Sequence, residues 1–193
     1  MKSHLMTKVI SLTLFFLVSI VAIKKYLIDQ YTIVSPSMLP LLKVGDKIWI
    51  SKTNKTLKVN DIAAFYAPNG ETTPYIKRCI GLSLDTLIIL QDGSLSLKNN
   101  SQNIGNQYFI IPKKGLSIKI NERNLSFYKP LIEQQEGGQI CIIGNQLYIN
   151  GAIKDTYTFQ QNYYFMVGDN RQNSQDSRHW GLVGEKLLLG KVL

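Results

Sequence analysis

Two serine hydroxyls lie close together in the segment Ser35-Pro36-Ser37-Met38-Leu39-Pro40. A serine is a weak nucleophile, and it attacks a carbonyl carbon only when a base lies within hydrogen-bond reach. The two prolines fix φ and push the residues before them toward extended conformations, so the sequence predicts a stiff loop and not a helix. Such a loop suits a nucleophile because its oxygen has to stay at attack distance. Taken alone, the segment is more typical of a turn, so the chemistry depends on a base elsewhere in the chain.

Two side chains are candidates for that base. His179 lies in a turn-like run, which is typical of an ordinary surface histidine. Lys77 lies in a predicted strand at 75–80, where it shares one face with Cys79 while Arg78 takes the other. If that face is buried, desolvation lowers the pKa of the ammonium toward neutral pH and turns the amine into a base. The plainer interpretation of a strand lysine is an exposed side chain.

A third polar stretch follows an apolar strand at 165–167 and ends at Trp180-Gly181. It contains two acids, two arginines and two serines but no lysine. So many hydrogen-bonding groups in one loop predict internal pairs, such as Asp176 with Arg178 or Arg171. We expect such a loop to hold other groups in place.

Composition narrows the function classes. The 193 residues carry a net charge of +9 and are 45% hydrophobic, which fits one well-cored domain. There is no zinc-finger spacing and no glycine-rich phosphate loop, so nucleic-acid binding is disfavoured. Only two cysteines are present, Cys79 and Cys141, which excludes a disulfide framework, although the pair is free to join in an oxidising compartment. With His4 and His179 as the only histidines, a metal site is not expected.

The N-terminal segment predicts membrane attachment. Residues 9–23 carry no charge, and lysines flank them on both sides. We expect a short tail at 1–8 and a transmembrane anchor at 9–28, because flanking lysines can reach the interface while Tyr26, Leu27 and Ile28 extend the span. The alternatives are a cleaved signal peptide, although no small-x-small cleavage site follows, and a buried core helix.

The remainder predicts an antiparallel, mainly β domain, because short β-branched and aromatic runs alternate with turn signals. We divide it into a first part of the β core at 32–97, an inserted subdomain at 98–159 and a second part at 160–193. A helix at 124–135 is expected, with Pro130 starting or kinking it. The predicted strands are 44–51, 61–67, 75–80, 86–91, the hairpin 139–143 with 146–149, and 185–193.

The inserted subdomain carries a cluster of basic residues. The ordinary interpretation of this cluster is a solvent-exposed face. The more specific interpretation is a patch that faces anionic lipid headgroups. The cluster comprises Lys98, Lys113, Lys114, Lys119, Arg123 and Lys129.

Three stretches, with the N-terminal segment before them, resemble in order and spacing the sequence boxes of type I signal peptidases. The stretches are Ser35-Pro36-Ser37-Met38-Leu39-Pro40; Tyr75-Ile76-Lys77-Arg78-Cys79-Ile80-Gly81 with Asp85; and Gly168-Asp169-Asn170-Arg171 followed by Ser174, Asp176, Ser177, Arg178, Trp180 and Gly181.

The resemblance implies a Ser-Lys serine endopeptidase that needs no cofactor and no metal. Ser37 would be the nucleophile and Lys77 the general base, and Ser35 would join the Ser37 backbone N–H in an oxyanion hole. Ser174 would hydrogen-bond the Lys77 amine. Asp176 and Arg178 would form a supporting pair, and Met38 would pack beside the nucleophile.

The resemblance also implies a substrate and a location. Members of the family cleave secreted preproteins after small residues at the first and third positions before the cut. They act on the outer face of the bacterial inner membrane, so membrane lipid is an expected neighbour and nucleic acid is not. This fixes an orientation for a single-pass anchor that the flanking lysines do not.

The chain departs from the family pattern in three places. Ser83 and Leu84 replace a Pro-Gly pair, which changes the local turn. Gly184 replaces a proline and is expected to loosen the entry to the last strand. His179 stands where an aromatic ring is more usual.

Three other functions remain open. One is a dedicated processing peptidase for a few precursors, such as pilin-like or conjugation proteins. A second is an anchored β-domain that binds peptides without catalysis. A self-cleaving repressor, which also uses a Ser-Lys dyad, is disfavoured because this chain has a hydrophobic segment in place of a DNA-binding helical domain.

Overall fold

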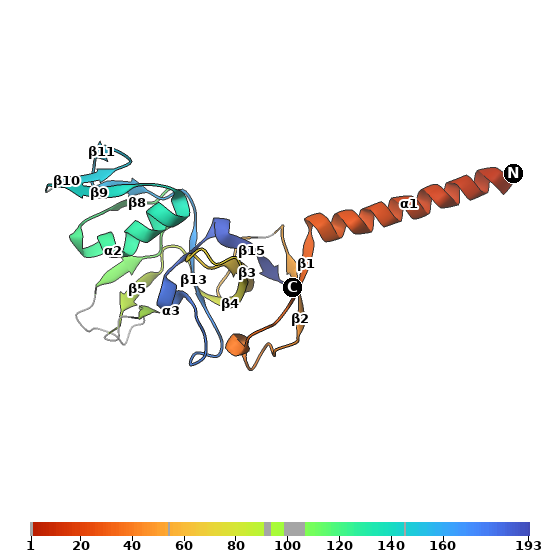
Figure 1. The fold of residues 1–193 in the computed structure, drawn as a ribbon, viewed down its shortest axis with the longest axis horizontal. Coiled ribbons are helices and arrows are strands. Elements are labelled where there is room, and N and C mark those ends of the chain that lie inside the picture. Colours follow the sequence, from red (N-terminus) through yellow and green to blue (C-terminus); the bar gives the residue numbers. More distant parts are fainter. Residues whose placement is uncertain (1, 54, 91–93, 99–106, 145) are drawn as a thin grey trace.

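The structure is a computed structural model that describes residues 2–53, 55–90, 94–98, 107–144 and 146–193. It is mainly β, as predicted, and every strand pairing is antiparallel among the described residues. A long N-terminal helix, α1 (Lys2–Tyr26), extends away from the β domain, while the C-terminus lies beside the first strands (Figure 1).

The main sheet of the predicted catalytic β core has seven strands in the order β1-β2-β15-β3-β4-β13-β14. Strands from both ends of the chain interleave, because β15 lies between β2 and β3. Strands from residues 28–81 and 163–192 therefore share one sheet, whereas the strands at 86–89 and 95–97, which the prediction assigned to the first part of the core, lie outside it. Its strands are β1 (Ile28–Thr32), β2 (Lys47–Ser51), β3 (Ile62–Tyr66), β4 (Pro74–Gly81), β13 (Tyr163–Val167), β14 (Val183–Gly184) and β15 (Leu188–Val192).

Two boundaries differ from the prediction at the start of this sheet. Helix α1 ends at Tyr26, and Ile28 begins β1 by pairing with Ser51, so Ile28 does not extend the helix. The predicted tail at 1–8 is helical from Lys2 onward. At the other end, residues 185–187 form a short 3₁₀ turn before β15, where the sequence predicted continuous strand.

The remaining strands form three small sheets, with the orders β6-β5-β7, β12-β8 and β11-β10-β9. The first of these sheets crosses the predicted start of the inserted subdomain at residue 98, because β5 and β6 precede that residue and only β7 follows it. The predicted hairpin is confirmed, since Ile143 pairs with Gln146. Asn150 and Gly151 have positive φ angles of 53° and 75°, as a tight turn into β11 requires. These strands are β5 (Thr86–Ile89), β6 (Leu95–Leu97), β7 (Tyr108–Ile110), β8 (Ser117–Lys119), β9 (Ile140–Ile143), β10 (Gln146–Ile149), β11 (Ala152–Ile153) and β12 (Thr156–Thr158).

The predicted helix at 124–135 is present but has two parts. Helix α2 (Glu122–Pro130) begins earlier than expected because Asn121 caps it, accepting hydrogen bonds from the backbone N–H groups of Arg123 and Asn124. Pro130 does not start the helix. It ends the regular α geometry, because it has no N–H to donate, and the chain continues as one turn of π-helix at Leu131–Gln135.

The nucleophile segment contains one turn of 3₁₀ helix at Pro36–Met38, where the sequence predicted a loop without helix. Pro36 occupies the first helical position, where a missing N–H costs nothing and φ is already suitable. Ser37 and Met38 are buried by this turn. The backbone of this segment thus differs from the predicted loop, and its expected stiffness stays a prediction.

Apolar side chains of α1 face outward, with Phe15 and Leu17 exposed by 66% and 65%. Among the described residues, no helix combines the length and the apolar character that crossing a membrane requires.

Candidate active site

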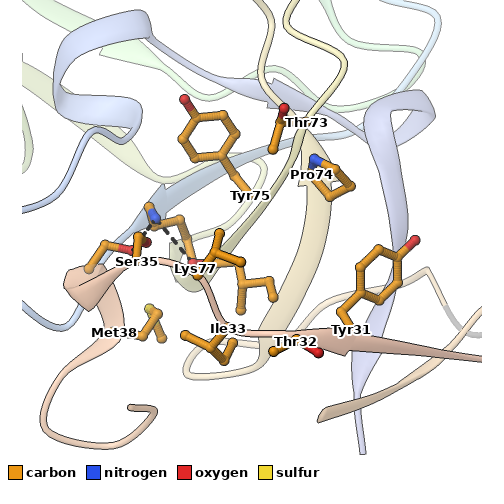
Figure 2. A pocket seen from close by; sticks show the side chains of 12 residues that line it. Tyr31, Thr32, Ile33, Ser35, Met38, Thr73, Pro74, Tyr75 and Lys77 are labelled. Atoms are coloured by element: carbon orange, nitrogen blue, oxygen red, sulfur yellow. Dashed lines mark hydrogen bonds between the residues drawn. The ribbon is translucent and has the colours of Figure 1, made fainter. Parts of the chain in front are cut away.

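Ser37 and Lys77 meet in the structure although they lie 40 positions apart in the sequence. Lys77 Nζ donates a hydrogen bond of 2.7 Å to Ser37 Oγ and a longer one of 3.2 Å to the Ile76 carbonyl. The 3₁₀ turn brings Ser37 to β4. Lys77 extends from β4 toward that turn (Figure 2). Once the amine is neutral, it can accept the Ser37 proton over the same distance, which is the geometry that nucleophile activation needs.

Burial makes Lys77 a suitable base. Its side chain is only 2% exposed, and Lys77 and Cys79 lie on the buried face of β4 as predicted. Desolvation lowers the pKa of Lys77 to about 8, against a smaller opposing effect of the Asp176 carboxylate. A substantial share of the amine is therefore neutral near physiological pH.

The turn that holds Ser37 is itself fixed by the loop after β13. The Asn170 backbone N–H donates to the Ser37 carbonyl at 3.1 Å, and Asn170 Nδ2 donates to the Pro36 carbonyl at 3.2 Å. Gly168 approaches the same turn so closely that a Cβ atom there would lie 2.6 Å from the Ser37 carbonyl oxygen. The loop thus holds the nucleophile turn in place through two hydrogen bonds and close packing.

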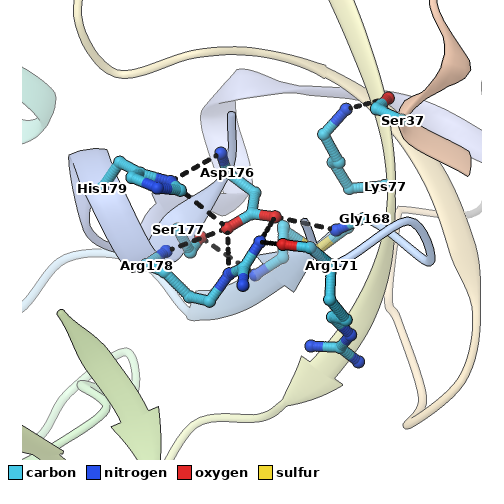
Figure 3. Close-up of polar contacts among 9 residues, drawn as sticks. Ser37, Lys77, Gly168, Arg171, Asp176, Ser177, Arg178 and His179 are labelled. Atoms are coloured by element: carbon cyan, nitrogen blue, oxygen red, sulfur yellow. Dashed lines mark hydrogen bonds and ion pairs between the residues drawn. The ribbon is translucent and has the colours of Figure 1, made fainter. Parts of the chain in front are cut away.

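Asp176 organises this loop. Its carboxylate accepts two hydrogen bonds of 2.9 Å from the Arg178 guanidinium, and its second oxygen accepts one from the Gly168 N–H at 3.0 Å (Figure 3). Burial opposes ionisation of Asp176, but these hydrogen bonds outweigh it and hold the pKa of the carboxyl below its ordinary value. The predicted Asp176–Arg178 pair is present, and the alternative partner Arg171 contributes only its carbonyl, which accepts from Arg178 at 2.8 Å.

The other predicted site residues lie at or near the dyad. Ser35 Oγ is 3.1 Å from Ser37 Oγ, and Met38 is buried beside the nucleophile. The predicted hydrogen bond between Ser174 and the Lys77 amine is not formed, because the amine is directed to Ser37 and to the Ile76 carbonyl. The Ser174 hydroxyl helps to lower the pKa of Asp176. The Ser174 hydroxyl is buried, and no atom of the described residues lies in a position to form a regular hydrogen bond with it.

His179 lies away from this centre. Its side chain is 48% exposed, and its Nδ1 accepts a hydrogen bond from the Asp176 N–H, which caps the short helix α3 (Ser177–Trp180). This agrees with the interpretation of His179 as a surface residue and leaves Lys77 as the candidate base.

Sequence reasoning missed three interactions that shape the site. Arg78, on the other face of β4, forms a two-pronged ion pair with Asp169 at 2.7 and 2.8 Å. Asn170 binds the nucleophile turn, and the buried Ser177 hydroxyl accepts from the Met166 N–H at 3.0 Å. All four side chains belong to stretches that the sequence had singled out. Their partners could not be assigned because the contacts join distant segments.

The departures from the family pattern are accommodated locally. Leu84 adopts a positive φ of 81°, the conformation that glycine would take more easily, and Ser83 Oγ accepts from the Tyr163 N–H at 3.3 Å. Gly184 is buried, pairs with Tyr163 and donates to Gln135 Oε1 at 2.8 Å, so the chain is tied at this point by hydrogen bonds. The loosening expected there stays a prediction.

A cleft of about 370 Å³ opens beside the dyad (Figure 2). One wall is the segment from the end of β1 to the nucleophile, and the other is the first half of β4. Strand β13 pairs with β4 only from Arg78 onward, so residues 74–77 of β4 have no β13 partner along that edge. The lining residues are Tyr31, Thr32, Ile33, Val34, Ser35, Ser37, Met38, Thr73, Pro74, Tyr75, Ile76 and Lys77.

The two cysteines are both free. Cys79 is buried and Cys141 is exposed, so they do not pair. Burial raises the pKa of the Cys79 thiol to about 12, which keeps it protonated and unreactive.

Comparisons with known proteins agree with this site. The family model described as "Signal peptidase, peptidase S26" matches residues 6–193. Signal peptidase I of Buchnera aphidicola subsp. Schizaphis graminum is 33% identical, over 92% of this chain and 70% of that protein. Signal peptidase I of Aquifex aeolicus is 27% identical, over 91% and 78%, and signal peptidase IB of Staphylococcus aureus is 26% identical, over 100% and 89%.

A solved signal peptidase I from Enterococcus faecalis V583 is 23% identical over 72% of this chain and 97% of that chain, with a TM-score of 0.33. The assignment rests on the sequence matches, which extend over nearly the whole chain. The chain belongs to the signal peptidase family, peptidase S26.

Proposed function

We propose that this chain removes signal peptides from exported preproteins with Ser37 as the nucleophile and Lys77 as the general base. The observation that carries the assignment is the 2.7 Å contact between Ser37 Oγ and a lysine amine that burial keeps partly neutral. A binding domain without catalysis offers no reason to bury a lysine against a serine, because an unpaired buried charge is costly.

The reaction has two stages. The neutral Lys77 amine takes the Ser37 proton as Oγ attacks the scissile carbonyl, and the resulting ammonium then protonates the leaving amine of the mature protein. A water molecule next attacks the acyl-enzyme ester. Lys77 takes the proton of that water and returns one to Ser37 Oγ, which frees the signal peptide with a carboxylate end.

The tetrahedral oxyanion requires hydrogen-bond donors. We assign the Ser35 hydroxyl and the Ser37 backbone N–H to this role, since Ser35 Oγ lies 3.1 Å from the attacking oxygen. Losing one such donor typically lowers the rate by about 10²–10³. Asp176 and Arg178 support the loop that binds the nucleophile turn, and the Ser174 hydroxyl helps to keep Asp176 ionised.

We further assign the cleft to the residues that precede the scissile bond. The cleft is lined by two chain segments, Ile33 to Met38 and Thr73 to Lys77. We expect the space between them to accept an extended peptide with small side chains near the cut. We assign α1 to membrane attachment, because its outward apolar side chains would otherwise face water. The domain would then lie on the outer face of the bacterial cytoplasmic membrane.

The test is cleavage of a preprotein with an Ala-x-Ala site by the detergent-solubilised protein, beside its Ser37→Ala and Lys77→Ala variants. We expect cleavage after the second alanine by the unaltered protein and by neither variant. Cleavage by Lys77→Ala at the full rate would refute the dyad. If only one precursor of a panel is cleaved, the enzyme is a dedicated processing peptidase instead.

Location is tested through the free thiols. In intact spheroplasts, a maleimide that cannot cross the membrane should label exposed Cys141, while Cys79 stays protected by burial. Labelling only after lysis would contradict the assigned face.

A further inference from the structure

The side-chain amide of Gln135, at the end of the π-helical turn, binds the chain segment that leaves the active-site loop. Its Nε2 donates to the Leu182 carbonyl at 2.9 Å, and its Oε1 accepts from the Gly184 N–H at 2.8 Å. One side chain therefore satisfies the two backbone groups that a neighbouring β-strand would otherwise bind. This contact joins the inserted subdomain to the catalytic sheet.

Gln161 completes the arrangement. It is 3% exposed, and its Nε2 donates to the Gln135 carbonyl at 3.1 Å, while its Oε1 accepts from the Lys186 N–H at 2.9 Å. A Cβ atom at Gly184 would lie 2.8 Å from Gln135 Oε1 and from Gln161 Cδ. The glycine thus permits both amides to reach the backbone, and their hydrogen bonds to it are partly buried.

The bound segment packs with residues that neighbour Lys77. Val183, between the two bonded residues, packs in one buried cluster with Cys79, which neighbours Lys77 on the same face of β4. Trp180, two positions before Leu182, packs edge-on against the Tyr75 ring with centroids 4.8 Å apart. The Lys77 amine lies 5.3 Å from the centre of that ring.

We propose that Gln135 is a positioning residue for catalysis. It holds Leu182–Gly184 in place, so that Trp180 and Val183 shield the Lys77 amine from water and keep it directed at Ser37. The inserted subdomain then serves the chemistry through this amide. The inference rests on the proposed roles of Ser37 and Lys77.

The experiment compares Gln135→Ala with Gln135→Glu and with the matched control Gln134→Ala, whose side chain is exposed. Peptide cleavage is measured from pH 6 to 10, with thermal unfolding in parallel. In Gln135→Ala we expect kcat to fall roughly ten- to a hundredfold, since small displacements of reacting groups are costly. KM should change little, because Gln135 does not line the cleft.

The pH profile separates positioning from a merely structural role. The groups that face Lys77 are the Ser37 hydroxyl, the Tyr75 ring and the Asp176 carboxylate. Water admitted around the amine would favour the ammonium, so the acid limb of kcat should move to higher pH. Gln135→Glu keeps the acceptor for Gly184 but loses the donor to Leu182, and an intermediate loss is expected. Gln134→Ala should match the unaltered protein.

The proposal is overturned if Gln135→Ala lowers the unfolding temperature yet leaves kcat and the acid limb unchanged well below that temperature. Ser37→Ala, assayed alongside, keeps this outcome distinct from a failure of the proposed function. Loss of cleavage in Ser37→Ala with full activity in Gln135→Ala removes only the positioning role. Cleavage by Ser37→Ala itself would remove the dyad.

Discussion

The buried amine of Lys77 should destabilise the folded domain at neutral pH, and Lys77→Met should therefore stabilise it. A pKa of about 8 in place of 10.5 corresponds to a cost of about 3 kcal/mol for the charged form in the folded state. Methionine fills a similar volume without charge. It loses the hydrogen bond to Ser37, which contributes about 1 kcal/mol. The expected net gain in unfolding free energy at pH 7 is about 2 kcal/mol.

The sign of the pH dependence follows from the two pKa values. The folded-state pKa lies below the ordinary value of 10.5, so the unfolded chain binds more protons between about pH 8 and 10.5. Stability of the unaltered protein should rise across this window, and below it the whole cost is present. The advantage of Lys77→Met should then shrink with rising pH and reach zero before pH 10.5, where the lost hydrogen bond to Ser37 leaves the variant slightly less stable.

The assay is denaturant unfolding in detergent at pH 7 and 10.5, followed by fluorescence of Trp49 and Trp180. Lys113→Met, at an exposed position, is the matched control and should show no pH-dependent difference. The reasoning is refuted if Lys77→Met is less stable at pH 7, or if its gain is the same at both pH values.

Three further predictions concern the site and its turn. The kcat/KM profile of peptide cleavage should have an acid limb near pH 8. Asp176→Asn should move this limb to lower pH, because the Asp176 carboxylate raises the pKa of Lys77, and an upward shift would contradict this. Gly168→Ala should lower kcat by roughly 10², since its Cβ would lie 2.6 Å from the Ser37 carbonyl, while circular dichroism stays unchanged; full activity would show that the turn tolerates displacement. Leu84→Gly should raise the unfolding free energy by about 1 kcal/mol by removing the strain of φ 81°, and a lower melting temperature would count against it.

Much of the local structure could be predicted because it depends on neighbours in the sequence. The alternation of β4 placed Lys77 and Cys79 on one face, and the glycine-asparagine turn placed the hairpin of β9 and β10. The boundaries were less accurate where a side chain decides them. Asn121 caps α2, which therefore begins at Glu122, two residues before the expected position. Pairing of Ile28 with Ser51 ends the N-terminal helix early.

The partners within the site were not predictable in the same way. Asp176 and Arg178 are two residues apart, so their pairing was expected and is found. Arg78 and Asp169 are 91 positions apart, and nothing local to either one indicates the other. The bond expected of Ser174 is absent because the direction of the Lys77 amine depends on where the turn at Ser37 lies.

By itself, the sequence determined which residues are chemically capable and which strand face or turn each one occupies. Its ordered boxes also determined the family. Only the tertiary structure decided that Ser37 and Lys77 lie 2.7 Å apart, that the lysine is 2% exposed, and that Gln135 binds the segment behind it. The physical reason is that backbone preferences act over a few residues, whereas desolvation and long-range hydrogen bonds depend on how distant surfaces of the whole chain pack together.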